Sequence, residues 1–179
     1  MDQNITLRKI EQKDCSPDLL AKFDRYREVK RCWRKENGAW ILKDIAFTEQ
    51  WDDTIKAQKI EGFIARIKNG GIVFGAYLDH ALIAYFCIDR PLFGCRNEYI
   101  NLDSLQVSYG FRHRGIGRIL FEKACAEAKM LGAKKLYISA HSAEETQAFY
   151  KAVGCYETVE LNQALFDEEP YDCHMECLL

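Results

Sequence analysis

The sequence lacks the features that mark membrane, secreted and repeat proteins. No apolar run approaches the length that spans a bilayer, and the N-terminal stretch MDQNITLRKIEQ has no apolar core of the kind found in signal peptides. No internal repeat or low-complexity tract is present. We therefore expect a cytoplasmic protein that acts without a membrane partner.

An excess of positive charge is also missing. The formal net charge is −2 at pH 7, whereas a general nucleic-acid binder needs a basic surface that neutralises several phosphates at once. A chain of 179 residues with 48% hydrophobic content can bury one sizeable core. We therefore expect a single domain over residues 1–179 and no nucleic-acid partner.

Eight cysteines are present, but their spacing shows no disulfide framework. They are scattered among strand-like and helix-like segments of a chain of average size, which favours reduced and mostly buried thiols. Only the tail CHMEC brings possible metal ligands together, namely Cys173, His174 and Cys177. The period of a strand places His174 on the opposite face from both cysteines, and zinc needs four convergent ligands. We therefore expect no metal site.

Apolar periodicity and turn signals predict alternating strands and helices. The predicted strands are 5–10, two runs of a hairpin between 72 and 85, 99–108, 136–140, 155–160 and 172–178. The predicted helices are 19–29, 50–68, 115–131 and 142–153, the last opened by a capping box at Ser142 and Glu145. The pair Asn37-Gly38 adds a further hairpin signal. This order favours an α/β or α+β class with a mixed sheet.

The stretch FRHRGIGRILFEKA (111–124) crowds three arginines, a histidine and two glycines directly before a helix. The glycines allow a ligand to approach the backbone where the helix begins. The first helical turn has amides without partners and the positive end of the macrodipole, and a pyrophosphate satisfies both. Arg112, Arg114 and Arg118 add donors and counter-charge. The stretch therefore predicts a phosphate-binding loop.

Two familiar phosphate loops do not fit this stretch. A dinucleotide-binding loop would need a third glycine where Leu120 stands, and a nucleoside-triphosphate loop would need Gly-Lys-Ser or Gly-Lys-Thr. The order that remains is a strand ending in VSYGF, the pattern Arg112-x-x-Gly115-x-Gly117, and an amphipathic helix. This order resembles the acetyl-CoA signature of the GNAT superfamily of N-acetyltransferases.

A second landmark of that family lies further along the chain. The family carries a helix with a small residue, Phe-Tyr and then Gly-Phe, and this chain has Ala148-Phe149-Tyr150 followed by Gly154-Cys155. Cys155 replaces the usual aromatic residue, and the asparagine often found near the start of the helix is absent. The resemblance implies a mixed, mostly antiparallel central sheet flanked by helices, and acetyl-CoA as co-substrate.

The resemblance also implies where acetyl-CoA binds. In GNAT enzymes the strand before the signature offers main-chain hydrogen bonds to the pantetheine arm, a role that falls here to Leu105 and Val107. The amides of the following loop hold the pyrophosphate. The residues implied around the diphosphate are Arg112, His113, Arg114, Gly115, Ile116, Gly117 and Arg118.

Acyl transfer from a thioester to an amine needs three things from the protein. The amine must be neutral, the tetrahedral oxyanion must be stabilised, and the departing thiolate must receive a proton. By resemblance, Tyr150 is the acid that protonates the sulfur of CoA. The backbone amide of Val107 is expected to meet the oxyanion.

Asp103 is the candidate for handling the proton of the amine. Strand alternation is expected to place Asn101, Asp103, Leu105 and Val107 on one side, with Asp103 beside the thioester. An ordinary aspartate pKa is a poor match for an amine, so relay through water or attraction of the cation is expected rather than direct abstraction. The alternative is a strand carboxylate with a structural partner. His141 and Glu98 are weaker candidates for the same task.

The leading hypothesis is an N-acetyltransferase that acts on the primary amine of a small molecule. Two alternatives stay open: acetylation of a protein terminus or lysine, and a non-catalytic sensor that binds acyl-CoA. An acidic loop at 167–169 either attracts a cationic amine or is a solvated loop. The aromatic residues of the N-terminal region, Tyr26, Trp33, Trp40 and Trp51, either wall the acceptor pocket or complete the core. A paired strand edge near the C-terminus would support a homodimer.

Overall fold

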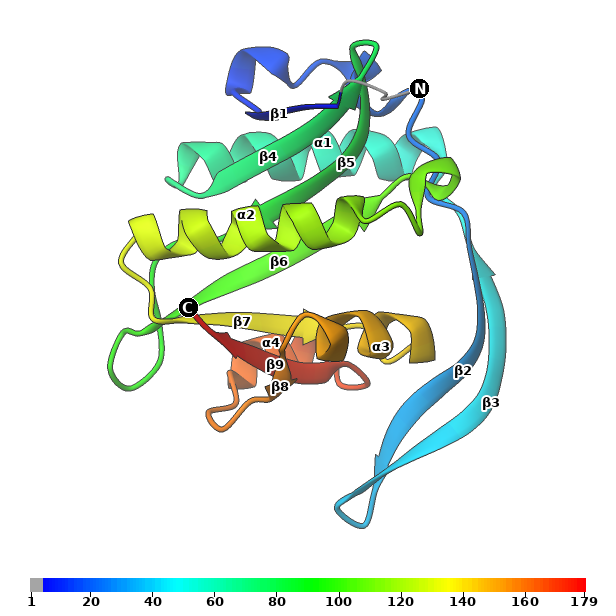
Figure 1. The fold of residues 1–179 in the computed structure, drawn as a ribbon, viewed down its shortest axis with the longest axis vertical. Coiled ribbons are helices and arrows are strands. Elements are labelled where there is room, and N and C mark those ends of the chain that lie inside the picture. Colours follow the sequence, from blue (N-terminus) through cyan, green and yellow to red (C-terminus); the bar gives the residue numbers. More distant parts are fainter. Residues whose placement is uncertain (1–4) are drawn as a thin grey trace.

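The computed structural model describes residues 5–179, which form one seven-stranded sheet, a separate two-stranded hairpin and the helices around them (Figure 1). The strands are β1 (Thr6–Lys9), β2 (Arg27–Glu36), β3 (Ala39–Glu49), β4 (Ile72–Leu78), β5 (Ala81–Ile88), β6 (Tyr99–Val107), β7 (Lys135–Ala140), β8 (Tyr156–Glu157) and β9 (Cys173–Leu178). The helices are α1 (Asp53–Lys68), α2 (Ile116–Met130), α3 (Glu144–Ala152) and α4 (Gln163–Glu168). Short 3₁₀ turns lie at Gln12–Asp14, Pro17–Leu20 and Tyr109–Phe111.

The large sheet has the strand order β1-β4-β5-β6-β7-β9-β8. Every neighbouring pair is antiparallel except β6 and β7, which α2 connects as a crossover helix. A crossover returns the chain in the same direction, so this pair is parallel. The predicted class, a mixed and mostly antiparallel sheet flanked by helices, is therefore confirmed.

A hydrophobic cluster lies on each face of the large sheet. On one face, α2 packs Ile116 and Leu120 onto strand residues such as Phe86. On the other face, α1 packs Ile60, Phe63 and its neighbours onto the opposite side of the same strands. Figure 1 shows α2 in front of the sheet and α1 behind it. The two faces are therefore separately covered, and a ligand can reach the middle of the sheet only where strands part.

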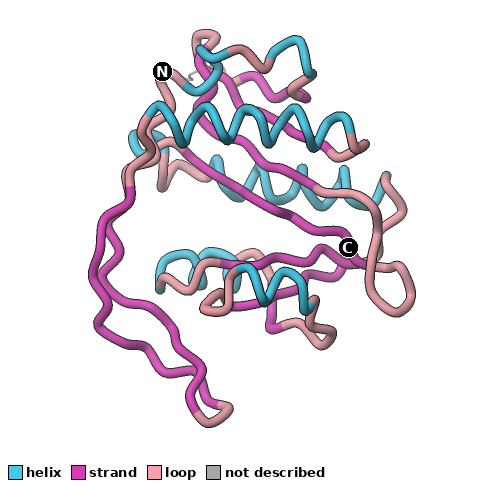
Figure 2. The backbone as a smooth tube through the Cα atoms, turned by 180° about the vertical axis from the view of Figure 1, so that it is seen from behind, coloured by secondary structure: helices cyan, strands magenta, loops and turns pink. Residues whose placement is uncertain are grey.

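The predicted hairpin at Asn37-Gly38 is confirmed. Both residues have positive φ, +51° and +82°, which suits the two central residues of a tight hairpin turn. The hairpin of β2 and β3 extends away from the large sheet, as Figure 2 shows. It is attached to the start of α3, because the amide of Trp33 donates to the carbonyl of Ser142 at 2.8 Å.

The predicted helix at 19–29 is wrong. The structure has only the 3₁₀ turn Pro17–Leu20 there, and β2 already begins at Arg27. Leu20 and Phe23 are buried in the cluster beneath α1, and Val29 pairs with Phe47 of β3. Tertiary packing and strand pairing therefore outweigh the local helical signal.

The other predicted elements are confirmed, although the strand predicted at 155–160 is only Tyr156–Glu157 and the hairpin predicted to end at 85 continues to Ile88. Two further details differ. The capping box of α3 does not form, because Ala143 is its N-cap residue and the Ser142 hydroxyl accepts instead from Arg34 of β2 at 2.7 Å. Helix α4 was not predicted, and it contains Asp167 and Glu168 of the expected acidic loop.

All eight cysteines are unpaired. Within residues 5–179, no three His, Cys, Asp or Glu side chains are arranged to hold a metal ion. In the same part of the chain, none of the helices has the length and apolar character of a membrane-spanning segment. The first residues of the N-terminal stretch, 1–4, lie outside the described residues.

Candidate active site

Strands β6 and β7 part soon after they begin to pair. Only Tyr99–Asn101 of β6 pairs with β7, although β6 continues to Val107 and β7 continues to Ala140 (Figure 1). From Asp103 onward the β6 residues are exposed or half-buried. The edges of both strands therefore carry backbone groups that do not pair with each other, and an extended ligand can use such groups.

The backbone of Val107 points into this opening. The amide of the next residue, Ser108, donates to the carbonyl of Ile83 at 2.8 Å on the β5 side. Successive residues of a strand point their backbone groups to opposite sides, so the amide of Val107 faces away from β5. Its carbonyl accepts from Nε of Arg112 at 3.0 Å. The amide predicted to meet the oxyanion is thus directed to the open edge.

Helix α2 begins at the end of this opening without a side-chain cap. Its N-cap residue is Gly115, whose φ of +79° suits glycine, and no side chain bonds to the first amides. Gly117 in the first turn allows close packing, because a Cβ there would lie 3.3 Å from Cε2 of Phe149 on α3. The free amides and the helix dipole together make this turn a favourable place for a phosphate.

The arginines around the loop are partly engaged with backbone. Arg112 binds the carbonyl of Val107, and Nη2 of Arg118 donates to the carbonyl of Ala152 at 3.1 Å. The guanidinium of Arg114 lies over the ring of Phe111, with 5.4 Å between its Cζ and the ring centroid. Since a guanidinium has five N–H groups, each of these side chains keeps donors for a further partner. Two of the three arginines therefore also tie the loop to β6 and α3.

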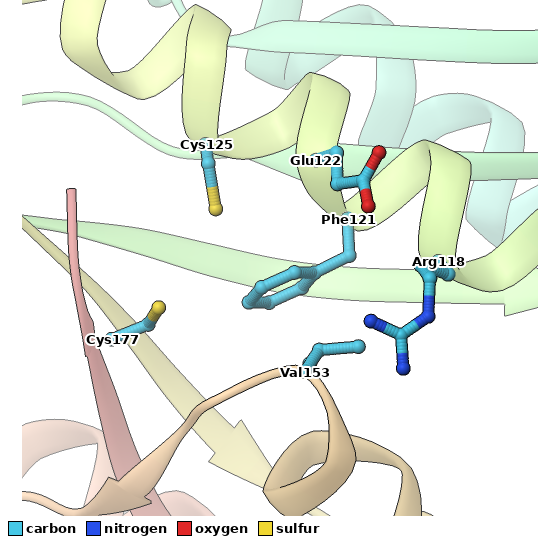
Figure 3. A pocket seen from close by; sticks show the side chains of 6 residues that line it. All are labelled: Arg118, Phe121, Glu122, Cys125, Val153 and Cys177. Carbon is cyan, nitrogen blue, oxygen red and sulfur yellow. The ribbon is translucent and has the colours of Figure 1, made fainter.

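A pocket of about 260 Å³ continues along α2 from the loop. Its lining residues are Arg118, Phe121, Glu122, Cys125, Val153 and Cys177. Figure 3 shows the Arg118 guanidinium near one end and the thiols of Cys125 and Cys177 near the other. The free strand edge, the uncapped helix and the nearby cations fit the pantetheine and diphosphate of acetyl-CoA.

Tyr150 lies on α3 and is only 6% exposed. Its ring packs against Phe121 of α2 with 6.2 Å between centroids. Burial raises the pKa of the phenol, and the nearby charges of Asp172 and Asp103 raise it further. The hydroxyl is therefore protonated at neutral pH, as a proton donor must be.

The expected alternation along β6 is wrong beyond Asp103. Ser104 pairs with Cys87 and Leu102 with Ile88, so Asp103 is an extra residue in a β-bulge. After the bulge, Leu105 and Val107 pack into the cluster beneath α2. Asp103 instead contacts α1, where its Oδ2 lies 2.9 Å from Nη2 of Arg66. Asp103 and the two pantetheine residues are thus on different faces of the sheet.

Asp172 is a carboxylate that the sequence interpretation missed. Its Oδ2 accepts from the hydroxyl of Ser139 at 3.3 Å, and Ser139 lies on β7 two residues beyond the last residue paired with β6. Burial and the charge of Glu169 raise the pKa of Asp172 to about 6. A lone acid in front of a strand gives no sequence signal of burial, so only the fold reveals it.

His141 and Glu98, the weaker candidates for handling the proton of the amine, both have structural partners. Nδ1 of His141 accepts from the amide of Ala143 at 3.0 Å, and burial lowers the pKa of His141 to about 4. Glu98 forms an ion pair with Lys135 at 3.3 Å where β6 and β7 are still joined. Neither residue is therefore placed to take a proton from an amine in the opening.

The aromatic residues of the N-terminal region have divided roles. Trp51 stacks on Phe23 in the core, with 5.9 Å between ring centroids, and Tyr26 packs edge-on against Tyr109 at 5.3 Å. Trp33 and Trp40 line a second pocket of about 200 Å³ between the hairpin, α3 and β9. The expectation that these residues complete the core therefore holds for Trp51.

Comparisons with known proteins agree with this geometry. The model of the Acetyltransferase (GNAT) family matches residues 15–155, whereas no curated protein matches the chain by sequence. Nourseothricin acetyltransferase superimposes with a TM-score of 0.69 at 17% identity, covering 97% of this chain and 98% of that chain. A provisionally named streptothricin acetyltransferase from Bacillus anthracis, in complex with acetyl coenzyme A, has a TM-score of 0.72 at 13% identity and coverages of 98% and 99%.

A structure with bound coenzyme A gives a similar result. The PaiA N-acetyltransferase of Thermoplasma acidophilum, in complex with coenzyme A, has a TM-score of 0.59 at 15% identity and covers 98% of this chain and 99% of that chain. The family match includes the loop, the opening between β6 and β7, and α3. The chain belongs to the GNAT family of acetyltransferases and is an acetyl-CoA-dependent acyltransferase.

Proposed function

We propose that the protein moves the acetyl group of acetyl-CoA to the primary amine of a small molecule, by direct attack in a ternary complex. The observation that carries the proposal is the opening between β6 and β7, which meets the uncapped start of α2 at Val107. The hairpin of β2 and β3 is hydrogen-bonded to the start of α3, and Figure 2 shows it on the side of the molecule where β6 and β7 part, across the expected path of an acceptor. This supports a small acceptor over a protein.

The proposed binding residues for acetyl-CoA are those of the open edge and the loop. Leu105 and Val107 offer backbone groups to the pantetheine arm. The diphosphate lies among Arg112, His113, Arg114, Gly115, Ile116, Gly117 and Arg118. Bound in this way, acetyl-CoA supplies an activated acyl group whose thiolate leaves readily.

The proposed roles of the catalytic residues follow from their positions. Asp172, with a pKa of about 6, accepts the proton of the acceptor's ammonium directly or through water. Asp103, bound to Arg66, adds negative charge beside the acceptor. The amide of Val107 stabilises the oxyanion, and Tyr150 gives its proton to the departing sulfur.

The proposed function is tested by the release of CoA thiol from acetyl-CoA in the presence of a mixed amine panel. The panel contains diamines, amino acids, aminoglycosides and lysine-containing peptides. Turnover with small amines and none with peptides is expected. Turnover with peptides alone would favour protein acetylation. Tight binding of acetyl-CoA without thiol release from any amine would favour a sensor and contradict the proposal.

Asp172→Asn is expected to remove a limb from the pH profile. In the unchanged protein, kcat/KM should rise with pH through an apparent pKa of about 6, because the ionised carboxylate accepts the proton. The variant should lose this limb and about 100-fold in kcat/KM at pH 7, the lower end of general base catalysis, with water left to take the proton. Asp167→Asn on α4 is the matched control. A limb near pH 6 that persists in Asp172→Asn would contradict the role of Asp172.

Asp172→Asn is also expected to stabilise the protein at pH 8. The folded state raises the pKa of this carboxyl from 3.8 to about 6, so it favours the protonated form. That contribution to the free energy of unfolding is present below pH 4 and is lost as pH rises through about 6, by up to about 3 kcal/mol. Thermal melts should therefore show a higher Tm for the variant at pH 8 and little difference at pH 4. A lower Tm at pH 8 would contradict this.

Three further expectations stay predictions. We propose that residues 1–179 act as a single domain, supported by a sheet whose strands run from β1 to β9. We propose a cytoplasmic location.

We also propose a homodimer that forms through the edge of the sheet at β8, and analytical sedimentation would measure the mass of the protein in solution.

A further inference from the structure

Arg25 is a buried cation that lacks partners for part of its guanidinium. It is 8% exposed, and its Nε and Nη1 are buried without a hydrogen-bond partner among residues 5–179. Buried donors are normally satisfied, and a charged donor left unpaired is costly. A partner for these two nitrogens is therefore to be expected from outside the chain.

The nearest carboxylate is already used. Oε2 of Glu49 accepts from Arg27, 2.9 Å from its Nε and 2.6 Å from its Nη2, and lies 3.4 Å from Nη2 of Arg25. One negative charge thus serves two guanidinium groups. Burial and the nearby charges of Arg27 and Arg112 lower the pKa of Arg25 to about 10, so it is still charged at neutral pH. The surroundings of Arg25 therefore have an excess of positive charge.

The segment that carries Arg25 is fixed to the end of β6. The amide of Asp24 donates to the hydroxyl of Ser108 at 3.0 Å, and the amide of Tyr109 donates to the carbonyl of Asp24 at 2.8 Å. Ser108 directly follows Val107, the proposed position of the thioester. Arg25 is thus held close to the reacting groups by the backbone contacts of Asp24, by its contact with Glu49 and by the ring of Trp51, whose centroid lies 5.6 Å from Cζ of Arg25.

Arg25 also lies on the side of the sheet from which the acceptor would come. Phe23, two residues earlier, packs on Tyr85 with 5.5 Å between ring centroids, and both belong to the cluster beneath α1. Asp103 is on this face through its contact with Arg66. The loop that we assign to the diphosphate begins α2, which covers the other face. The guanidinium of Arg25 lies over the ring of Trp51, which packs against the same cluster, so the unpartnered donors are on the acceptor's side of the sheet.

We infer that Arg25 binds a carboxylate of the acceptor, so that the acceptor is an amino acid or a related compound with both an amine and a carboxylate. The inference rests on the proposed function, since it places the amine near Asp172 and Asp103 and the carboxylate at Arg25. A charge-assisted hydrogen bond to a carboxylate satisfies buried guanidinium donors. It also discriminates against amines that leave those donors unpaired.

The test compares acceptors that differ only in the carboxylate: L-lysine with cadaverine, L-ornithine with putrescine, and β-alanine with ethylamine. The protein should acetylate the amino acid of at least one pair about tenfold more efficiently than its partner amine, judged by kcat/KM. Arg25→Gln should raise KM for that amino acid at least about tenfold and change kcat/KM for the amine little. Arg25→Lys should restore part of the difference. Arg31→Gln, on the exposed side of the hairpin, is the matched control.

Calorimetry in the presence of CoA keeps the inference separable from the proposed function. The six compounds are titrated into the protein and into Arg25→Gln, and only the amino acids should lose affinity in the variant. Failure of every amine to release CoA would sink the proposed function, while this binding difference would still support the carboxylate site. Equal affinities for acid and amine in the unchanged protein would overturn the inference. A tenfold loss of acetyl-CoA affinity in Arg25→Gln would also overturn the inference, because it would mean that Arg25 binds a phosphate of CoA and not a carboxylate of the acceptor.

Discussion

Gly117→Trp is expected to abolish measurable binding of acetyl-CoA. The side chain would project from the first turn of α2, where even a Cβ would lie 3.3 Å from Phe149 and 3.8 Å from Val107. An indole there blocks the approach of a diphosphate to the free amides of the helix. Loss of two charge-assisted hydrogen bonds, each worth about 1.5–3 kcal/mol, corresponds to at least about 100-fold in affinity. Calorimetric titration with acetyl-CoA and with CoA measures the effect.

Ile119→Trp is the matched control for this experiment. Ile119 lies on the same helix and is 49% exposed, so the same bulk should leave affinity unchanged. A thermal melt of each variant shows whether the fold is retained, because the packing of α3 on Gly117 is tight. Where Gly117→Trp fails to fold, Arg114→Glu reverses a charge at an exposed position of the loop and should weaken binding. Unaltered affinity in the folded loop variants would remove the phosphate assignment.

Tyr150→Phe is expected to lower kcat by up to about 100-fold, the lower end of general acid catalysis, because a thiolate leaves readily even without a proton donor. The affinity for acetyl-CoA should change less than about twofold, since the ring still packs against Phe121. Because burial and two carboxylates raise the pKa of Tyr150, the loss should be similar from pH 6 to pH 9. Steady-state kinetics and calorimetry on the same preparation separate the two quantities.

The control for Tyr150→Phe is Tyr156→Phe. Tyr156 lies on the edge strand β8 and is exposed, so removal of its hydroxyl should leave both kcat and affinity unchanged. A parallel loss of turnover and of acetyl-CoA affinity in Tyr150→Phe would mean that the hydroxyl supports the binding site. In that case the role of proton donor would fall to another group.

Asp172 and Arg25 change the interpretation of the acceptor site. In the sequence analysis, one role considered for the acidic loop at 167–169 was to attract a cationic amine. In the structure, Asp167 lies on α4 and accepts from Gln163 at 2.7 Å. The half-buried carboxylate with a raised pKa is Asp172, and the buried cation with two unpartnered donors is Arg25. An acceptor that satisfies both carries an amine and a carboxylate.

The uncapped start of α2, which we assign to the phosphates, was predictable because it depends on local sequence. A run of residues that starts a helix decides where the free amides lie, and Gly115 and Gly117 within the run decide whether a ligand can approach them. The alternation of strands and helices was also predictable from local sequence, because the spacing of apolar residues distinguishes the period of a helix from that of a strand. For the same reason the hairpin at Asn37-Gly38 was visible in the sequence.

The positions of the charged residues on the proposed acceptor side of the sheet depend on tertiary structure alone. Asp103 is the extra residue of a β-bulge and contacts α1, and no spacing in the sequence predicts a bulge there. The segment 19–29 became a turn and a strand because its apolar residues fit the sheet and the hairpin. Burial raises the pKa of Asp172 and leaves two donors of Arg25 without a partner, and it depends on elements far apart in the chain. The sequence by itself thus determined the glycine-rich, uncapped start of α2 that we assign to acetyl-CoA, whereas long-range packing decided which charges lie on the side that we assign to the acceptor.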